Sequence, residues 1–332
     1  MGNRLNGRVA VVTGSGQGIG KSIAIAMAEE GAKLITNNRR PGSTALKSYD
    51  KEFLKTLSTK EAERAARVVQ DAETTADEIR DMGGEAIPFF GDISEFDIAG
   101  QLMRTALDHF GKIDILVNNA GAFHMSPVWE MSLEAWHKVV DSHLQGTFNC
   151  IRHTAGPMKQ QGWGRIINAI SGAWLGQTNG CNYSAAKGGV VGLTRAVARD
   201  MYPFGVTCNA FAPAAMTRSM ASGIIHSRRV TASGGPGIPE EKLKMLENTP
   251  LPEAIAPFIL YLATDEAAHI SGSVFSLMGN HIGLYSEPSE VSTLDKQKGY
   301  WTVGELIEQI PKGLLNNYKS PAAQEQHGIP GQ

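Results

Sequence analysis

Three side chains near the middle of the sequence have the types and spacing that proton transfer to an oxygen requires. Tyr183 and Lys187 stand four residues apart at the start of an apolar helical pattern, which puts the phenol and the ammonium on one face. A phenol has a pKa of about 10 and is a poor base at neutral pH, but a nearby cation lowers that pKa. Ser171 follows the apolar stretch 165–170, where its hydroxyl can hold a substrate oxygen beside Tyr183. The three residues indicate acid/base chemistry on a carbonyl or a secondary alcohol.

A glycine-rich turn lies between the apolar stretch 8–13 and the helical pattern that follows it. Glycine lets the backbone approach a pyrophosphate, and the N–H groups of the next helix favour the phosphate charge. In this context the turn predicts a bound dinucleotide, and a plain tight turn is the alternative. The turn residues expected to contact the cofactor are Gly14, Ser15, Gln17, Gly18, Ile19 and Gly20.

The end of the second apolar stretch decides the type of cofactor. A carboxylate there binds the ribose hydroxyls of NAD, whereas an arginine accommodates the phosphate of NADP. This chain has no acidic residue at that point. It has Asn38, Arg39 and Arg40 instead. NADP(H) is therefore favoured over NAD(H), although two solvated surface arginines would give the same sequence.

Short apolar stretches alternate with helical patterns along most of the chain. Strands of this kind are covered on both faces, and repeated β-α alternation implies a parallel sheet. We therefore predict the α/β class, with a Rossmann-type doubly wound parallel sheet. The expected strands are 8–13, 33–36, 86–90, 114–118, 165–170, 205–211 and 273–278.

The order and spacing of these motifs resemble those of the short-chain dehydrogenase/reductase family. The similarity spans residues 5–282 and rests on the glycine turn, Asp92, the Asn118–Gly121 stretch, Ser171 and the Tyr183–Lys187 pair. The resemblance implies a hydride transfer between a nicotinamide and a carbonyl or secondary alcohol. It also implies that Lys187 bonds the nicotinamide ribose and that Asn118 lines the cofactor. The further cofactor contacts that it implies are Asp92, Ile93, Asn119, Ala120, Gly121, Tyr183, Pro213 and Thr217.

The chain departs from that family pattern at two informative positions. His143 occupies the place of the usual catalytic asparagine, and Ala214 follows Pro213 where the family has glycine. Both features are similar to the dehydrogenase part of peroxisomal multifunctional enzymes, which oxidise (3R)-hydroxyacyl-CoA with NAD. We predict that Ser171, Tyr183, Lys187 and His143 form the catalytic set. For His143 two roles stay open, a proton relay to solvent and a structural substitute for the asparagine.

The substrate itself is less constrained by the sequence. The segment 214–250 has an apolar interior and should cover the substrate, while Trp174 should form a wall. A 3-hydroxyacyl-CoA or 3-oxoacyl thioester is the preferred substrate, and a cyclic or steroid-like secondary alcohol is the alternative. A remote alternative is a cofactor-binding sensor without catalysis, which turnover of any ketone would exclude. The basic residues that can meet CoA phosphates, or equally form a solvated face, are Arg218, Arg228, Arg229, Lys242 and Lys244.

Composition excludes several other classes of protein. Hydrophobic residues make up 42% and charged residues 19% of the chain, and the net charge is -2. We expect a small-molecule substrate and neither nucleic acid nor membrane as a partner. Three cysteines without paired spacing, Cys150, Cys181 and Cys208, indicate free thiols in a reducing compartment, so a cytoplasmic location is expected. No metal site is expected.

Two segments exceed a minimal domain of this kind. Residues 40–62 lengthen the connection after the second strand, and a helix is predicted over 62–84. We place the dehydrogenase domain at 1–282 and a C-terminal extension at 283–332, where 302–310 should be a short helix. A homodimer or homotetramer is expected through the helices near 132–161 and 181–202. The apolar residues behind these two expectations are Val190, Val191, Leu193 and Val197, and in the extension Trp301, Val303, Leu306, Ile307 and Ile310.

Overall fold

The computed structural model describes residues 2–42, 70–217, 238–318 and 320–322, with a few single positions between 218 and 237. The chain divides into a compact unit that ends at Leu284 and a small second unit, Tyr285–Ile329. Most of the predicted insertion, 43–62, lies outside the described residues. The same is true of Arg218 and Arg229 and of the side chain of Lys242.

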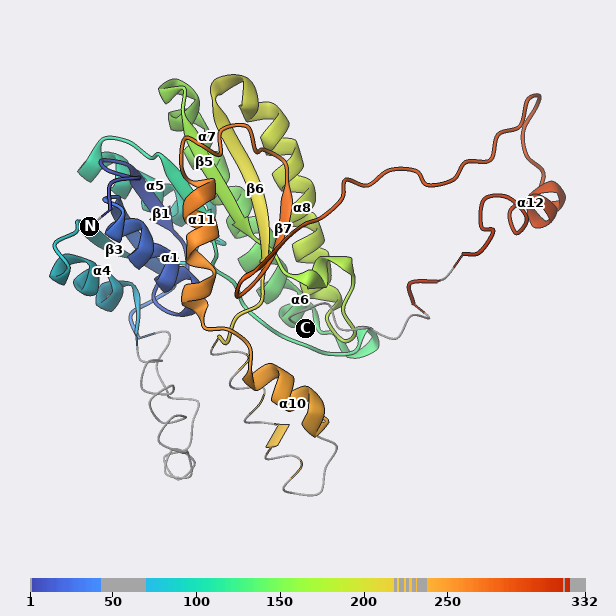
Figure 1. Ribbon diagram of the computed structural model, residues 1–332, viewed down its shortest axis with the longest axis horizontal. Coiled ribbons are helices and arrows are strands. Elements are labelled where there is room, and N and C mark those ends of the chain that lie inside the picture. Colours follow the sequence, from blue (N-terminus) through green and yellow to red (C-terminus); the bar gives the residue numbers. More distant parts are fainter. Residues whose placement is uncertain are drawn as a thin grey trace. The chain divides into compact units, whose positions relative to one another are not determined.

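The larger unit is built on one sheet of eight strands in the order β3-β2-β1-β4-β5-β6-β7-β8 (Figure 1). The first seven strands are parallel, which confirms the predicted doubly wound α/β fold. Their bounds are β1 (Val9–Val12), β2 (Lys33–Asn38), β3 (Ala86–Phe90), β4 (Ile115–Asn118), β5 (Gly164–Ala169), β6 (Val206–Pro213) and β7 (Val274–Met278).

The eighth strand was not predicted. β8 (His281–Leu284) runs antiparallel to β7, with Met278 opposite His281, so the hairpin turn has only two residues. The turn begins at Gly279, whose φ of +59° suits such a connection. β8 therefore covers the edge of β7 and is itself the edge strand of the sheet.

Helices cover both faces of the sheet, which is why most residues of the parallel strands are buried. In β1, Ala10 and Val12 belong to one hydrophobic cluster and Val9 and Val11 to the other. The first cluster packs under α1 (Gly18–Glu29), α4 (Ala72–Asp81) and α11 (Ala256–Leu262). The second packs under α5 (Phe96–Phe110), α7 (Gly146–Gln161) and α8 (Cys181–Met201). Two shorter helices, α6 (Leu133–Val140) and α10 (Glu240–Glu247), also belong to this unit.

Helix α4 begins later than the sequence predicted. A helix over 62–84 is wrong, since Gln70 lies outside any helix and Asp71 is the extended N-cap residue of α4. The Asp71 carboxylate accepts the Thr74 N–H at 3.1 Å, and Thr74 Oγ1 accepts the Asp71 N–H at 2.8 Å. This capping box satisfies the free N–H groups of the first turn and starts the helix at Ala72.

The apolar residues on which the predicted oligomer rested are not a free surface. Val190 and Val191 are buried within the chain, and Leu193 and Val197 pack against its second hydrophobic cluster. The helical periodicity of α8 therefore reflects burial under its own sheet. These four residues give no support to a subunit interface.

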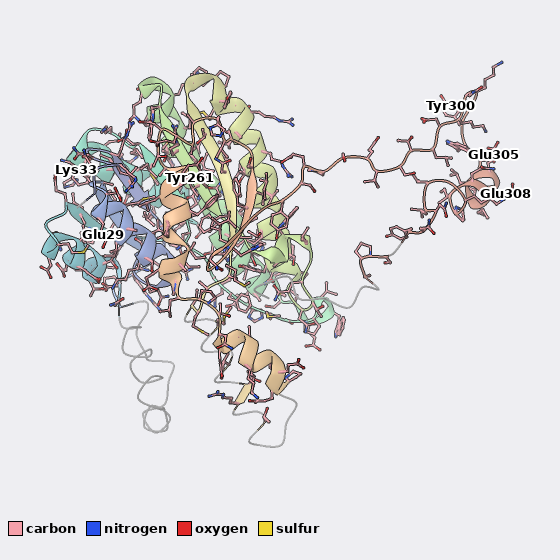
Figure 2. All side chains as sticks on the ribbon, in the orientation of Figure 1. Glu29, Lys33, Tyr261, Tyr300, Glu305 and Glu308 are labelled. Atoms are coloured by element: carbon pink, nitrogen blue, oxygen red, sulfur yellow. The ribbon has the colours of Figure 1, made fainter. Side chains whose placement is uncertain are left out.

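The C-terminal unit contains the predicted helix, α12 (Val303–Gln309). Lys296 donates to both carboxylate oxygens of Glu305 at 2.7 Å, and Thr302 and Glu305 form a capping box. These bonds lower the pKa of Glu305 to about 2, and the bond from Lys296 has the largest effect. Glu305 and Glu308 lie on this helix (Figure 2). Val303 and Ile307 remain 74% and 69% exposed, so this unit does not bury the apolar face of its own helix. Within the described residues, no helix has both the length and the apolar character needed to span a membrane.

Candidate active site

The glycine turn is held in place by the turn that follows β4. Gly14 has a φ of +63°, and a Cβ there would lie 2.7 Å from Ala120 Cα, so only glycine fits. Thr13 Oγ1 accepts the N–H groups of Asn119 and Ala120 at 3.0 and 3.1 Å. Asn119 Nδ2 in turn donates to the carbonyl oxygens of Thr13 and Gly14 at 3.2 Å. The two segments predicted to line the cofactor therefore form one braced structure.

Helix α1 offers a phosphate-binding end directly behind this turn. Its N-cap residue, Gln17, makes no side-chain cap, and the first turn of α1 carries no acidic residue. The free N–H groups and the helix dipole at this end favour an anion. This arrangement fits the pyrophosphate of a dinucleotide.

The predicted catalytic residues Ser171, Tyr183 and Lys187 come from two elements that meet at the end of β5. Ser171 caps a short 3₁₀ helix (Gly172–Leu175), with its Oγ accepting the Ala173 N–H at 3.2 Å. Tyr183 lies in the first turn of α8, and its ring and the Lys187 Nζ are 5.6 Å apart. Lys187 Nζ donates to the Ala169 carbonyl at 2.6 Å and so ties α8 to the end of β5. The structure thus brings Ser171, Tyr183 and Lys187 together, and Ser171 is hydrogen-bonded to Tyr183.

The pKa of Tyr183 differs from the sequence-based expectation. Burial raises it above the ordinary value, and the hydrogen bond with Ser171 only offsets part of that effect. The expectation that Lys187 lowers the pKa of the phenol is wrong for this structure, because burial lowers the pKa of Lys187 itself to about 7. Near neutral pH the amine is therefore only partly charged, and the phenol keeps its proton.

His143 lies where the helical path between α6 and α7 widens into one π-helical turn (Asp141–Gln145). Its Nε2 is 2.7 Å from the Ala122 carbonyl oxygen, and because a carbonyl can only accept, Nε2 carries the proton. Burial, with a contribution from Lys187, holds the pKa of His143 well below its usual range. The ring packs edge-on against Tyr183 at 5.1 Å, and a Cβ at Gly121 would collide with it. His143 is thus a neutral side chain that pins the turn after β4.

A buried polar chain under the predicted catalytic residues was not expected from the sequence. Asn118 Nδ2 donates to Asn168 Oδ1 at 2.9 Å, and Asn168 Nδ2 donates to Thr194 Oγ1 at 3.0 Å. The chain joins the ends of β4 and β5 to the middle of α8. The Asn118 side chain therefore braces the sheet, and only its Oδ1 is left for another donor.

At the adenosine end, the structure supplies carboxylates that the end of β2 lacks. Arg39 Nε lies 3.0 Å from Asp92 Oδ2, and Asp92 Oδ1 accepts the N–H and the hydroxyl of Ser94. A Cβ at Gly16 would collide with Asn38 Oδ1 and lie 2.6 Å from the Asp71 backbone. No sequence signal pairs Arg39 with Asp92, since the two residues belong to separate strand ends that only the sheet order makes neighbours.

The remaining predicted residues lie in or beside the segment after β6. Ala214 N donates to the Leu277 carbonyl at 2.8 Å, which continues the pairing of β6 with β7 past Pro213. Thr217 Oγ1 accepts the Met220 N–H at 3.5 Å. Of the basic residues suggested for CoA, Arg228 forms an ion pair with Glu247, and Lys244 is exposed.

Comparison with known proteins agrees with this geometry. A family model described as short chain dehydrogenase matches residues 50–228. The chain belongs to the short-chain dehydrogenase family. It is accordingly an NAD(P)-dependent oxidoreductase that interconverts a ketone and a secondary alcohol.

Individual relatives are similar over most of the chain. A 3-oxoacyl-[acyl-carrier-protein] reductase from Synechocystis is 35% identical, with 84% of this chain and 98% of that protein aligned. Peroxisomal multifunctional enzyme type 2 from Drosophila melanogaster is 36% identical over 81% of this chain but only 38% of that protein. A crystal structure of a short chain dehydrogenase from Mycobacterium avium covers 92% of this chain and 93% of its own, at 30% identity and a TM-score of 0.70.

Proposed function

We propose that this short-chain dehydrogenase interconverts a 3-oxoacyl thioester and the corresponding 3-hydroxyacyl thioester. One observation carries the cofactor half of this proposal: four buried acceptor atoms around the site have no partner among the described residues. They are Gln17 Oε1, Asn38 Oδ1, Asn118 Oδ1 and His143 Nδ1. Buried polar atoms are nearly always paired, so such a group of acceptors indicates a bound molecule with donors. Ribose hydroxyls and a carboxamide are donors of this kind.

The substrate half of the proposal rests on the relatives. The Synechocystis relative is named for an acyl group, as a 3-oxoacyl-[acyl-carrier-protein] reductase. The side chains that would contact the carbonyl, Ser171 and Tyr183, are compatible with any ketone. A cyclic or steroid-like alcohol is therefore the competing substrate in the test below.

The chain's own residues divide the work of reduction. A nicotinamide, when bound, supplies the hydride. Tyr183 gives its phenolic proton to the substrate oxygen, and the Ser171 hydroxyl holds that oxygen in place. Lys187, anchored on the Ala169 carbonyl, is positioned to bond the cofactor ribose. A raised pKa keeps the Tyr183 proton in place at neutral pH, which suits the phenol to act as a proton donor.

His143 is proposed to position the turn after β4 rather than to carry protons through its ring. A relay through both nitrogens would require Nε2 to exchange with a group that can take a proton, but Nε2 faces the Ala122 carbonyl. Only Nδ1 remains, as a buried acceptor. That atom can hold a donor beside Tyr183.

For the cofactor, we propose a modest preference for NADP(H). Arg39 and Arg40 are exposed at the end of β2, where a phosphate can reach them. The ion pair with Asp92 competes with that phosphate and limits the preference. We expect Asn38→Asp with Arg39→Leu to favour NADH, and Asp92→Asn to raise the NADPH preference several-fold.

We also propose a homo-oligomeric assembly, a reducing compartment and a role for the C-terminal extension. The free thiols Cys150, Cys181 and Cys208 support a reducing compartment such as the cytoplasm. The exposed apolar residues of α12 support docking of the segment 283–332 onto its own or a neighbouring subunit of a homo-oligomer. Deletion of 296–332 tests this, with the oligomeric state and the substrate KM as readouts.

The decisive experiment is a substrate panel with purified protein and both cofactors. We expect oxidation of NADPH with acetoacetyl thioesters, and rates with cyclic ketones at least tenfold lower. Turnover of cyclic or steroid ketones alone would replace the thioester by the alternative. Cofactor binding without turnover of any ketone would contradict the enzymatic assignment altogether.

A further inference from the structure

Large apolar side chains lie exposed beside the catalytic tyrosine. Phe123 is 51% exposed, although its ring packs edge-on against the Tyr183 ring with centroids 5.5 Å apart. Met125, two residues on, is 42% exposed. Tyr183 is thus flanked by two rings, Phe123 and His143, and of these only Phe123 is open to solvent. An exposed aromatic ring in contact with a catalytic group is a surface for an apolar ligand.

The segment that carries Phe123 is fixed to the start of α8. Ser126 N donates to the Asn179 carbonyl at 2.7 Å, and a parallel bridge joins Ser126 to Gly180. Gln177 Nε2 approaches Met125 Sδ at 3.8 Å. Gln177 also donates its backbone N–H to the Ser184 hydroxyl, at 2.9 Å. The loops after β4 and β5 therefore form one wall, tied to the helical turn that carries Tyr183.

We propose that Phe123 and Met125 form the wall that receives the alkyl chain of the substrate, and that Phe123 sets the chain-length preference. This inference rests on the proposed function, because it takes an acyl thioester as substrate. The reacting carbonyl must lie at the Tyr183 hydroxyl, so chain carbons a few bonds away reach a ring 5.5 Å from that of Tyr183. Neither wall residue carries a charge, which suits the alkyl end of the substrate and not its phosphate-bearing end.

The expected size of the effect follows from apolar burial. Full burial of one methylene increases binding by a factor of about four. A wall that covers only one side of the chain supplies about half of that free energy, which is a factor of about two per methylene. Four additional methylenes along the wall should therefore raise kcat/KM by about tenfold or more. Truncation of Phe123 should remove most of this increment relative to the rate with the shortest substrate.

The test compares 3-oxoacyl N-acetylcysteamine thioesters with acyl chains of four, eight and twelve carbons. We expect kcat/KM of the wild type to rise with chain length, and Phe123→Ala to flatten this rise when each rate is divided by the same variant's four-carbon rate. Phe123→Leu should restore part of the slope. Trp129→Ala is the matched control, because Trp129 is an aromatic residue of the same connection that is 81% exposed and contacts solvent.

Two results would overturn the inference: a Phe123→Ala profile parallel to that of the wild type, or an equal flattening in Trp129→Ala. The four-carbon rate of the wild type tests the proposed function separately. If the wild type reduces no thioester, the proposed function fails, and the same comparison on methyl n-alkyl ketones decides the role of Phe123. If Phe123→Ala leaves the chain-length dependence with these ketones unchanged, the role of Phe123 in binding the alkyl chain is also wrong.

Discussion

The two ends of the parallel strands both hold buried ionisable side chains, but their polar atoms are satisfied in different ways. At the amino end of β5, Arg165 is 1% exposed and donates to the carbonyl oxygens of Thr264, Gly164 and Gly205. Its guanidinium also lies 4.3 Å from the Trp163 ring centroid, and Trp163 Nε1 donates to Asp265 at 2.7 Å.

At the carboxyl end, the buried groups are left incomplete. Lys187 has one carbonyl acceptor, and the acceptors Asn38 Oδ1, Asn118 Oδ1 and His143 Nδ1 have no partner in the part of the chain that the structure describes. A buried group whose hydrogen bonds are made within the chain stabilises the fold, whereas an acceptor that lacks a partner is free to take a donor from a bound molecule, as proposed above. The comparison assigns stability to the amino end and chemistry to the carboxyl end, and substitutions at each end can break it.

The largest effect should come from Tyr183→Phe. We expect a loss of about two to four decades in kcat, the usual contribution of a positioned proton donor. Cofactor binding and the urea midpoint should stay close to the wild type, because the phenol hydroxyl is not part of the packed core. Steady-state kinetics, cofactor titration and urea unfolding give the three readouts. Near-normal turnover would remove Tyr183 from the mechanism.

Arg165→Met should lower stability and leave kcat nearly unchanged. The variant removes three hydrogen bonds to main-chain carbonyl oxygens, so we expect the free energy of unfolding to fall by about 3 kcal/mol. The kcat per folded molecule, counted by cofactor titration, should change less than twofold. A loss of kcat with unchanged unfolding would reverse the roles of the two ends.

Lys187 should make the free energy of unfolding depend on pH. Its pKa is about 7 in the folded protein against about 10.5 unfolded, so the unfolded state binds more protons between these values. Stability from this group therefore rises with pH, by about 2 kcal/mol between pH 7 and 9. We expect this rise to be absent in Lys187→Met, as measured by urea unfolding at both pH values. An identical pH slope in the variant would show that Lys187 stays charged.

The smallest effect is expected for His143→Asn. A neutral His143 does not titrate in the working range, so both limbs of the pH–rate profile should keep their positions, with kcat within about fivefold. His143→Ala removes the bond to the Ala122 carbonyl, and we expect its KM for the cofactor to rise several-fold. A limb that shifts in the asparagine variant would restore the relay role.

Much of the site was predictable because its signals are local. The spacing of Tyr183 and Lys187, the glycine turn and the alternation of strands and helices each depend on neighbours within a few residues. Reliance on periodicity also explains the two errors, the start of the helix near Asp71 and the missed strand β8. A capping box and a two-residue hairpin are local as well, but each interrupts an apolar pattern that the periodicity alone would extend or end elsewhere.

The sequence by itself determined the fold class and the family resemblance and predicted which residues would do the chemistry, since backbone periodicity and turn chemistry are written in adjacent positions. Only the tertiary structure decided how those residues are charged and paired. Desolvation of Tyr183 and Lys187, the tautomer of His143 and the bond between Arg39 and Asp92 all depend on groups far apart in the chain. Burial and through-space contacts have no period in a sequence, and they exist only once the sheet has set its strand order.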